Sequence, residues 1–171
     1  YPLRRQRQMC IRDRLNGLLF HCPDLVQIPR AGIVHRLDKD TTGLMVVAKT
    51  LQAQTSLVAQ LQDRSMGREY EAVLQGPMIS GGTVDEPISR HGTQRTKMAV
   101  NPMGKEAITH YRILHRFPSH TYVRCKLETG RTHQIRVHMT HIGHPLVGDR
   151  TYAASQRLKK VCLLYTSPSP R

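Results

Sequence analysis

Residues 35–50 read HRLDKDTTGLMVVAKT, and this stretch governs the interpretation of the whole chain. One acid, Asp38, follows a His-Arg pair and precedes a Thr-Thr-Gly turn, after which residues 44–48 are apolar and include two adjacent valines. A short continuous apolar run of this kind predicts a buried strand. Asp38 is then expected on a loop at the mouth of a sheet, beside fixed positive charge. Neighbouring cations favour the ionised carboxylate, so Asp38 is a candidate nucleophile or base.

Plainer interpretations exist for both acids of this loop. Asp38 could cap a turn or pair with Arg36 at the surface, as most surface aspartates do. Asp40 is interpreted as a turn former whose side chain bonds the backbone of the two threonines that follow. The length and order of the motif around Asp38 favour catalysis for that residue.

Length and charge restrict the class of protein. The 171 residues suit one domain with a real core, and with 5% aromatic residues and no Trp that core must rest on Leu, Ile, Val and Met. Lys and Arg number 26 against 12 acids, a formal net charge of +14. Excess charge of this size favours a polyanionic partner such as RNA. The alternatives are a solubilising surface or a small ribosome-associated protein.

The sequence contains no apolar run long enough for a membrane span and no signal peptide pattern at its start. Its four cysteines are scattered without a CxxC pair, which predicts free thiols. We therefore expect a cytoplasmic protein.

The two ends of the chain do not share the pattern of the middle. Residues 1–14 contain five Arg and no periodicity, and residues 161–171 finish on a Ser-Pro repeat. Both could be disordered tails, the first one basic enough to contact RNA. We favour instead two non-native tails, translated from sequencing-adapter read-through, because MCIRDR and CLLYTSPSPR resemble such products. The remaining body, 15–160, is still basic and is expected to be a fragment cut at both ends.

The body reads as an α+β fold with a mixed, mainly antiparallel sheet and a few flanking helices. Helices are expected at 15–22, at 51–62 after a Thr50 N-cap, and from about residue 131 to 139. Strands are expected at 68–74, 98–100, 107–117 and 121–127, the last two joined by a hairpin connection at 118–120. Residues 88–97 are expected to form a polar, basic loop.

A second motif, ETGRTHQIRVHM, occupies residues 128–139. Gly130 permits a backbone geometry that other residues avoid, and Arg131 follows it at an expected helix start. Arg131 and Gln134 share one helix face at a spacing of three. Arg131 and Arg136 could be simple phosphate contacts, and this is the interpretation we prefer for Arg136.

The ten histidines raise the question of a metal site. No acid or cysteine completes a known ligand spacing, and HExxH is absent, so structural or RNA-facing histidines are expected and no metal.

These motifs together resemble the RluA-type pseudouridine synthases. The resemblance covers about residues 15–152, nearly all of the body. It rests on PRAGI, HRLDKDTTGL, REYEA, GGTVDEPISRH, GRTHQIRVHM and HPLVGD. It implies the pseudouridine synthase catalytic core, in part, and an isomerase that converts uridine to pseudouridine in structured RNA. The motif set is most similar to the bacterial subtype that modifies helix 69 of large-subunit ribosomal RNA.

The resemblance also implies roles for three residues at the reacting nucleotide. Asp38 corresponds to the catalytic acid, and Arg131 to an arginine that forms a salt bridge with it. Such a guanidinium would keep the carboxylate charged and fix its rotamer. Tyr70 corresponds to a tyrosine that packs against the target uracil and assists proton removal. The alternative for Tyr70 is an ordinary core tyrosine.

Four further residues are expected to contact RNA or to shape the loop that does. Arg36 corresponds to the arginine that enters the RNA stack in place of the flipped uridine, a position suited to a planar cation. His35 is expected to orient the loop by hydrogen bonding. Arg136 and Gln134 are expected at the RNA surface.

The implied reaction requires no cofactor, metal or second substrate, because the uracil leaves the sugar and reattaches to it. One carboxylate would suffice, whereas a retaining glycosidase needs a second acid to activate water. The nucleotide must be flipped out of its helix, and the site must exclude water. The expected partner is large-subunit ribosomal RNA, bound by a monomer.

Three features of the family are missing from this sequence: an N-terminal S4 domain, a KPxG strand and an ALHA-type segment. We therefore expect residues 15–160 to lack part of the central sheet and to be inactive alone. Two other function classes remain open. One is a non-catalytic, basic RNA-binding module, and the other is a metal-dependent hydrolase built on the histidines.

Overall fold

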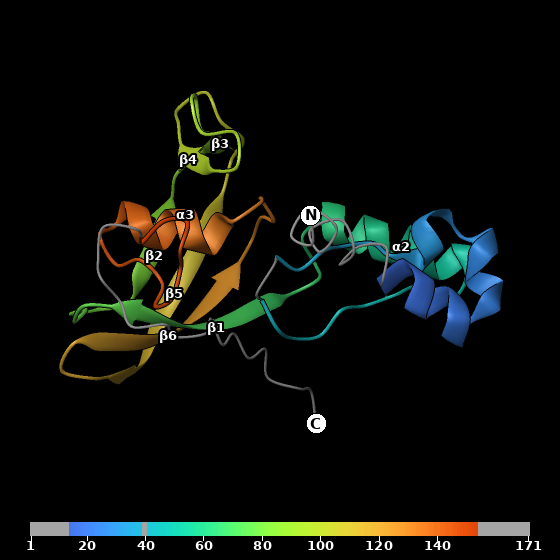
Figure 1. The fold of residues 1–171 in the computed structure, drawn as a ribbon, viewed down its shortest axis with the longest axis horizontal. Helices are drawn as coiled ribbons and strands as arrows, with labels where there is room; N and C mark the ends of the chain where they lie inside the picture. The colour runs from blue at the N-terminus through green and yellow to red at the C-terminus, as the bar shows by residue number, and fades with distance from the viewer. Residues whose placement is uncertain (1–13, 39–40, 154–171) are drawn as a thin grey trace, which may run out of the picture. The chain divides into compact units, whose positions relative to one another are not determined.

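The computed structural model describes residues 14–38 and 41–153 and confirms the α+β class. The described elements are η1 (Pro23–Gln27), η2 (Pro29–Gly32), α2 (Leu51–Gln62), β1 (Arg68–Gln75), β2 (Gly82–Asp85), β3 (Ile88–Arg90), β4 (Met98–Val100), β5 (Ile108–Arg116), β6 (His120–Leu127) and α3 (Gln134–His141) (Figure 1). They divide between two compact units, one with residues up to 36 and 45–66, the other with 37–44 and residues from 67 onward. Asp40 and nearly all of both expected tails lie outside the described residues.

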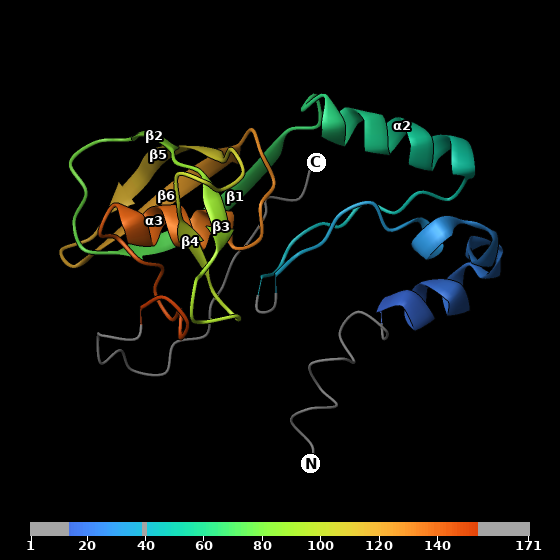
Figure 2. The same cartoon turned by 90° about the horizontal axis from the view of Figure 1, so that it is seen from above.

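The first unit is largely helical. Residues 14–21 form the expected helix before Pro23, and α2 begins and ends at the expected residues (Figure 2). The Thr50 side chain accepts a hydrogen bond from the Ala53 N–H at 3.1 Å, which confirms the expected N-cap. One buried cluster of this unit comes from the two 3₁₀ turns and the residue between them, and it consists of Leu25, Ile28 and Ala31. None of the residues of α2 is fully buried. Nowhere in the described ranges is a helix both long and apolar enough to cross a membrane.

The expected buried strand at 44–48 is not present. Val47 forms one isolated antiparallel bridge with Ile33, and the Ala48 N–H donates to the Gly32 carbonyl at 2.9 Å. Leu44 and Val46 are exposed, and only Ala48 is buried. An apolar run predicts burial, whereas a strand also needs a neighbour along its whole length, and the described residues supply one only at Val47.

The second unit is built on a four-stranded antiparallel sheet in the order β1-β6-β5-β2. Side chains on β6 alternate as a half-buried strand requires: Thr121, Val123 and Cys125 are buried, and the residues between them face the other side. The expected strands at 68–74, 107–117 and 121–127 are confirmed with end shifts of one residue. The Phe117 N–H bonds the His120 carbonyl at 2.8 Å and closes the expected hairpin.

Helix α3 covers the buried face of this sheet (Figure 1). Ile135 and Met139 of α3 pack in one core cluster with Leu74 of β1 and with Val123 and Cys125 of β6. Burial raises the pKa of the Cys125 thiol to about 12, so this cysteine is an unreactive core residue. Cys22 and Cys125 are both free thiols, as expected.

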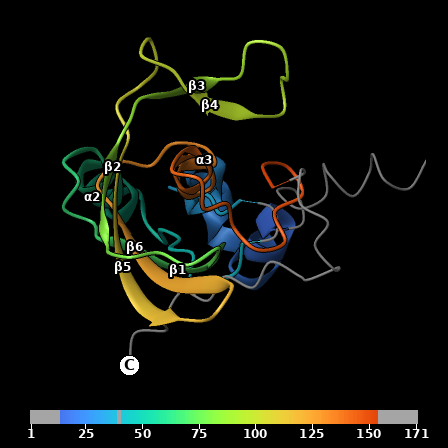
Figure 3. The same ribbon diagram turned by 90° about the vertical axis from the view of Figure 1, so that its left-hand side faces the viewer.

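The opposite side of α3 carries a two-stranded hairpin, β3 and β4 (Figure 3). Val137 of α3 packs with Ile88 and Ala107 in a small second core. Residues 88–97 are therefore not a loop throughout, because 88–90 pair with 98–100. The sequence did not predict β3 because only Ile88 of its three residues is buried, so no apolar alternation is present. The result is a layered unit of sheet, helix and hairpin.

The buried ring of His138 gives this unit a testable pH dependence. Its Nε2–H can only donate to the Glu86 carbonyl, 3.0 Å away, so its Nδ1 faces Thr109 Oγ1 at 2.9 Å as an acceptor. Burial lowers the pKa of His138 below its ordinary 6.5, and the neighbouring His141 lowers it further, against smaller opposing effects of Glu86 and Asp85. The neutral ring therefore stabilises the fold above about pH 6.5 and this contribution is lost as the pH falls.

We expect the free energy of unfolding to fall between pH 7.5 and pH 5.5, measured by urea denaturation and far-UV circular dichroism. The variant His138→Asn should be less stable but should lose much of that pH slope. His141→Gln, an exposed change on the same helix, is the control and should keep most of it. An unchanged slope in His138→Asn would show that another group titrates.

Candidate active site

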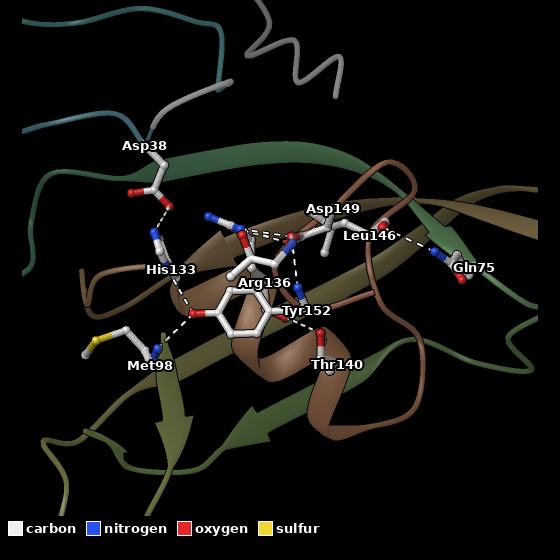
Figure 4. A network of polar contacts seen from close by, with 10 residues as sticks. Asp38, Gln75, Met98, His133, Arg136, Thr140, Leu146, Asp149 and Tyr152 are labelled. Atoms are coloured by element: carbon white, nitrogen blue, oxygen red, sulfur yellow. Dashed lines mark hydrogen bonds and ion pairs between the residues drawn. The ribbon is translucent and has the colours of Figure 1, made fainter. Parts of the chain in front are cut away.

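Asp38 lies in the second unit, on the loop that follows the extended residues 33–36. The Thr41 N–H donates to the Asp38 carbonyl at 3.1 Å and closes a turn there. The Asp38 side chain is one-fifth exposed at 20%, so it is accessible but not immersed in solvent. Its Oδ2 lies 4.0 Å from His133 Nε2 (Figure 4). The Asp38 carboxylate is thus partly shielded from water, has one oxygen near a ring nitrogen, and remains accessible to a ligand.

Tyr70 is half-buried on β1 and is close enough to Asp38 to sense its charge. Burial raises the pKa of the phenol, Arg68 lowers it to a lesser degree, and the Asp38 carboxylate raises it again. The net effect is upward, so Tyr70 is a neutral phenol near pH 7. A neutral phenol packs against a flat base and donates a hydrogen bond more readily than it accepts a proton.

Arg68 connects this strand with the second motif. Its guanidinium lies directly against Gly130, so that a Cβ at residue 130 would collide with Nη1. Its Nη2 is 3.5 Å from the Glu128 carbonyl, while its buried Nε has no hydrogen-bond partner among the described residues. A larger residue at 130 would therefore displace the end of the Arg68 side chain from its present position.

His133 stands at the start of α3 in a left-handed conformation, with φ 57°. Its Nδ1 is 2.8 Å from the Tyr152 hydroxyl, which also accepts a hydrogen bond from the Met98 N–H at 2.9 Å (Figure 4). The two rings meet edge to face with centroids 5.7 Å apart. A continuous chain of polar groups thus runs from the hairpin through Tyr152 and His133 to Asp38.

Comparison with known proteins identifies the family. A model of the RNA pseudouridylate synthase family matches residues 22–141, which include Asp38, Tyr70 and His133. The chain belongs to the RNA pseudouridylate synthase family. Two solved structures support the assignment at the level of the fold. Human RNA Pseudouridylate Synthase Domain Containing 1 has a TM-score of 0.71 at 28% identity, over 78% of this chain and 60% of that one. Human RNA Pseudouridylate Synthase Domain Containing 4 has a TM-score of 0.70 at 26% identity, over 93% and 73%.

Bacterial relatives within the pseudouridylate synthase family are more similar in sequence. Ribosomal large subunit pseudouridine synthase D of Pseudomonas aeruginosa is 67% identical over 147 residues, which are 86% of this chain and 46% of that protein. The protein of the same name from Escherichia coli is 67% identical over 146 residues, 85% of this chain and 45% of that protein. The chain thus spans slightly less than half the length of these relatives. The expected similarity to the RluD type of RluA-type synthase is confirmed.

The structure gives Arg131 partners other than the expected one. Its Nε donates to the Glu106 carbonyl at 2.8 Å and its backbone N–H to Gln134 Oε1 at 2.9 Å. Among the described residues Asp38 has its ion-pair contact with His133 and none with Arg131. The expected Asp38–Arg131 salt bridge is therefore not present in this pseudouridylate synthase structure, and a catalytic role for Arg131 stays a prediction.

Gln134 and Arg136 are turned into the protein, contrary to their expected position at the RNA surface. The Gln134 side chain is 3% exposed. Its Oε1 accepts from Thr129 and Arg131, and its Nε2 donates to Ile108 and Thr109. All four hydrogen-bonding positions of the amide are used within the protein. Gln134 is therefore not at the surface: it is a buried residue whose hydrogen bonds link the GRTH segment to β5.

Arg136 forms a forked pair with a buried acid. Its Nε and Nη2 donate to the two Asp149 oxygens at 2.7 and 2.9 Å, and its guanidinium lies 4.9 Å from the centre of the Tyr152 ring. The Asp149 side chain is 0% exposed and that of Arg136 is 12% exposed. A bidentate pair so enclosed has a structural role, and the expected contact of Arg136 with phosphate stays a prediction.

His35 and Arg36 belong to the first unit and lie just before residues 37–44, which belong to the second unit. His35 Nε2 accepts a hydrogen bond from the Val46 N–H at 2.9 Å, so it joins the chain entering residues 37–44 to the chain leaving them. This is the kind of hydrogen bond expected of a loop-orienting residue. Arg36 is exposed, as a residue that enters an RNA stack must be, and its role stays a prediction.

His133, Tyr152 and Arg68 contribute to the site although their side chains carried no functional prediction. His133 lies within the GRTHQIR motif, two residues after Arg131, and this position was the one sequence feature that could have pointed to it. Tyr152 comes from the far end of the described chain and carries no sequence signal linking it to Asp38. In the part of the chain that the structure describes, no group of three or more His, Cys, Asp or Glu residues is placed to hold a metal ion.

Proposed function

We propose that this chain is the catalytic part of an RNA pseudouridine synthase that isomerises specific uridines in large-subunit ribosomal RNA, with helix 69 as the target. The observation that carries the proposal is the placement of Asp38. It is a partly shielded carboxylate in the same compact unit as Tyr70, within the stretch that matches the family. Residues 15–160 are proposed as the partial catalytic domain, and both ends as non-native tails.

The proposed reaction rearranges one nucleoside without gain or loss of atoms. The bond between the sugar C1′ and uracil N1 breaks, the uracil turns while held in the site, and a new bond forms between C1′ and uracil C5. The hydrogen on C5 leaves as a proton, and N1 acquires one. Asp38 supplies the single anionic group, either by attack on C1′ or by removal of a sugar proton. No cofactor is needed.

The neutral phenol of Tyr70 would pack against the detached uracil and hold it close to the sugar. Its raised pKa favours this role over that of a general base, since ionising a buried phenol beside a carboxylate is costly. Arg36 is proposed to fill the RNA stack after the uridine flips out. The excess of cations over acids supports binding of RNA. A monomer that acts in the cytoplasm, where bacterial ribosomal RNA is found, is part of the same proposal.

The test is release of tritium from RNA labelled at uracil C5. Because residues 15–160 are expected to be inactive alone, the activity assays place them in the matching segment of the full-length Pseudomonas aeruginosa relative, and this full-length chimera is the parent for every rate measured. It would be incubated with a transcript of the large-subunit segment that contains helix 69, and with a transcript in which the target uridines are replaced by cytidine. We expect release from the first RNA only, and pseudouridine at those positions after carbodiimide modification and primer extension. RNA binding without release from either transcript would favour the non-catalytic RNA-binding alternative.

A further inference from the structure

Tyr152 determines which nitrogen of His133 carries a proton. The Met98 N–H can only donate, so the Tyr152 oxygen is an acceptor in that bond. Among the described residues the acceptor nearest to the phenol's own hydrogen is His133 Nδ1, 2.8 Å away. Nδ1 is thereby fixed as the acceptor, and the proton of the neutral ring must sit on Nε2.

Nε2 is the ring atom that faces Asp38. The 4.0 Å between Nε2 and Asp38 Oδ2 is about 1 Å beyond the range of a hydrogen bond. Contacts at catalytic sites are commonly long before the substrate binds and tighten in the complex. A small approach of the Asp38 loop, or one bridging water, would make the Nε2–H a direct or relayed donor to the carboxylate.

Tyr152 is well placed to hold the histidine because its own position is fixed from several sides. The Arg136 guanidinium covers its ring at 4.9 Å, and the Asp149 carboxylate that grips Arg136 also accepts from the Tyr152 backbone N–H at 3.1 Å. Burial raises the pKa of the Tyr152 phenol, the Met98 bond and Arg136 oppose this in part, and Asp149 and Asp38 add to it. The phenol therefore remains a donor at neutral pH.

The backbone of His133 gives independent support. A left-handed conformation at a residue other than glycine is strained and persists where the surroundings impose it. Here it turns the ring away from α3 and between Tyr152 and Asp38 (Figure 4). Strain of this kind gathers at functional sites.

We propose that His133 is a positioning residue for Asp38: Tyr152 locks its ring in the Nε2–H tautomer, and that N–H orients the carboxylate for its task. The proposal rests on the proposed function for its kinetic consequence but not for its structural content. His133 touches neither sugar nor base. It acts by keeping one Asp38 oxygen engaged, so that the other is aimed at the nucleoside.

The first test reads the tautomer directly and needs no activity. Ring ¹⁵N shifts of His133 would be measured in the 171-residue chain above pH 7, with the variants Tyr152→Phe and Tyr122→Phe. We expect a single Nε2–H tautomer in the parent chain and in Tyr122→Phe. Tyr122 is a matched control, because its phenol donates to the Glu71 carboxylate on the opposite face of the sheet. Tyr152→Phe keeps the ring but should yield a mixture of tautomers. A parent ring protonated on Nδ1 would overturn the proposal.

The second test separates the N–H of His133 from its backbone conformation. Gln can place an amide N–H where Nε2–H stood, whereas Asn places its amide near the Nδ1 position but tolerates the left-handed conformation better. If the N–H is what matters, His133→Gln should keep more turnover than His133→Asn. His133→Ala should lose about a hundredfold in kcat with KM within about twofold. Higher activity in Asn than in Gln would mean that the backbone alone is important.

The two tests also separate this proposal from the proposed function. If the full-length chimera releases no tritium, the proposed function fails, while the ¹⁵N shifts still decide whether Tyr152 sets the tautomer. If the parent chain is active and the tautomer is as expected, but His133→Ala turns over normally, the positioning role is wrong and the proposed function stands.

Discussion

Replacing Asp38 by Asn is expected to reduce pseudouridine formation by about a thousandfold or more while leaving the fold intact. The amide has the shape of the carboxylate but neither its charge nor its basicity, and such groups contribute several orders of magnitude to a rate. The Asp38 side chain is 20% exposed and its ion-pair contact with His133 is long, so its loss should cost little stability. Tritium release under single-turnover conditions measures the rate, and filter binding measures RNA affinity.

The matched control is Asp85→Asn, which removes one negative charge from an exposed residue at the end of β2 in the same unit. It should turn over at a normal rate, and both variants should bind RNA within about threefold of the parent chain, since a single charge contributes modestly to a phosphate-dominated interaction. Asp38→Asn with more than a tenth of the parent rate would exclude Asp38 as the reacting acid.

Replacing Asp149 by Asn is expected to destabilise the second unit by about 3–5 kcal/mol, because the enclosed Arg136 charge loses the carboxylate that accepts its two hydrogen bonds. The Asp149 side chain is fully buried and also accepts hydrogen bonds from the backbone of Thr151 and Tyr152. Urea denaturation, followed by far-UV circular dichroism since the chain lacks Trp, measures the loss. Arg136→Met in the same background should recover part of it, and no recovery would mean that Asp149 acts through the backbone alone.

The same pair predicts how stability responds to acid. Burial alone would raise the pKa of Asp149, but the Arg136 guanidinium and the two backbone N–H groups outweigh it and hold the pKa below its ordinary 3.8. A carboxylate with a lowered folded pKa stabilises the protein fully above about pH 4 and loses that contribution as the pH falls through the folded value. The difference in stability between the parent chain and Asp149→Asn should therefore be constant above about pH 5 and shrink below about pH 4. A difference that does not change with pH would contradict the assignment.

The fold was predictable where a local signal was also the structural cause. Helix α2 follows from its apolar spacing and Thr50, and the hairpin of β5 and β6 from its alternation and turn. The prediction of a strand at 44–48 was wrong because apolar residues predict burial but do not provide a neighbouring strand with which to pair. Strand β3 was missed for the opposite reason, since its polar residues conceal a pairing that residues 98–100 provide from ten positions away.

At the candidate site the sequence indicated which residues to consider, but it did not indicate the direction in which their side chains point. The motif around Asp38 singled out a carboxylate that lies close to Tyr70 in the structure, and its catalytic role stays a prediction. For the GRTHQIR segment, residue order could not reveal that Gln134 and Arg136 turn inward while His133 turns toward Asp38. Direction here depends on the left-handed start of α3, a conformation that is uncommon for any residue other than glycine and that residue order does not signal.

Cys125 offers a built-in reporter for the opening of this protein. Its sulfur lies in the middle strand of the core, and a thiol with a pKa of about 12 is almost entirely protonated at neutral pH. Alkylating reagents need the thiolate and physical access, and the folded sheet denies both. Brief exposure to a maleimide, followed by peptide mass spectrometry, would therefore count the molecules in which α3 has left the buried face of the sheet. Ribosomal RNA added beforehand should slow that modification if it grips the closed form, giving a binding assay that requires no turnover.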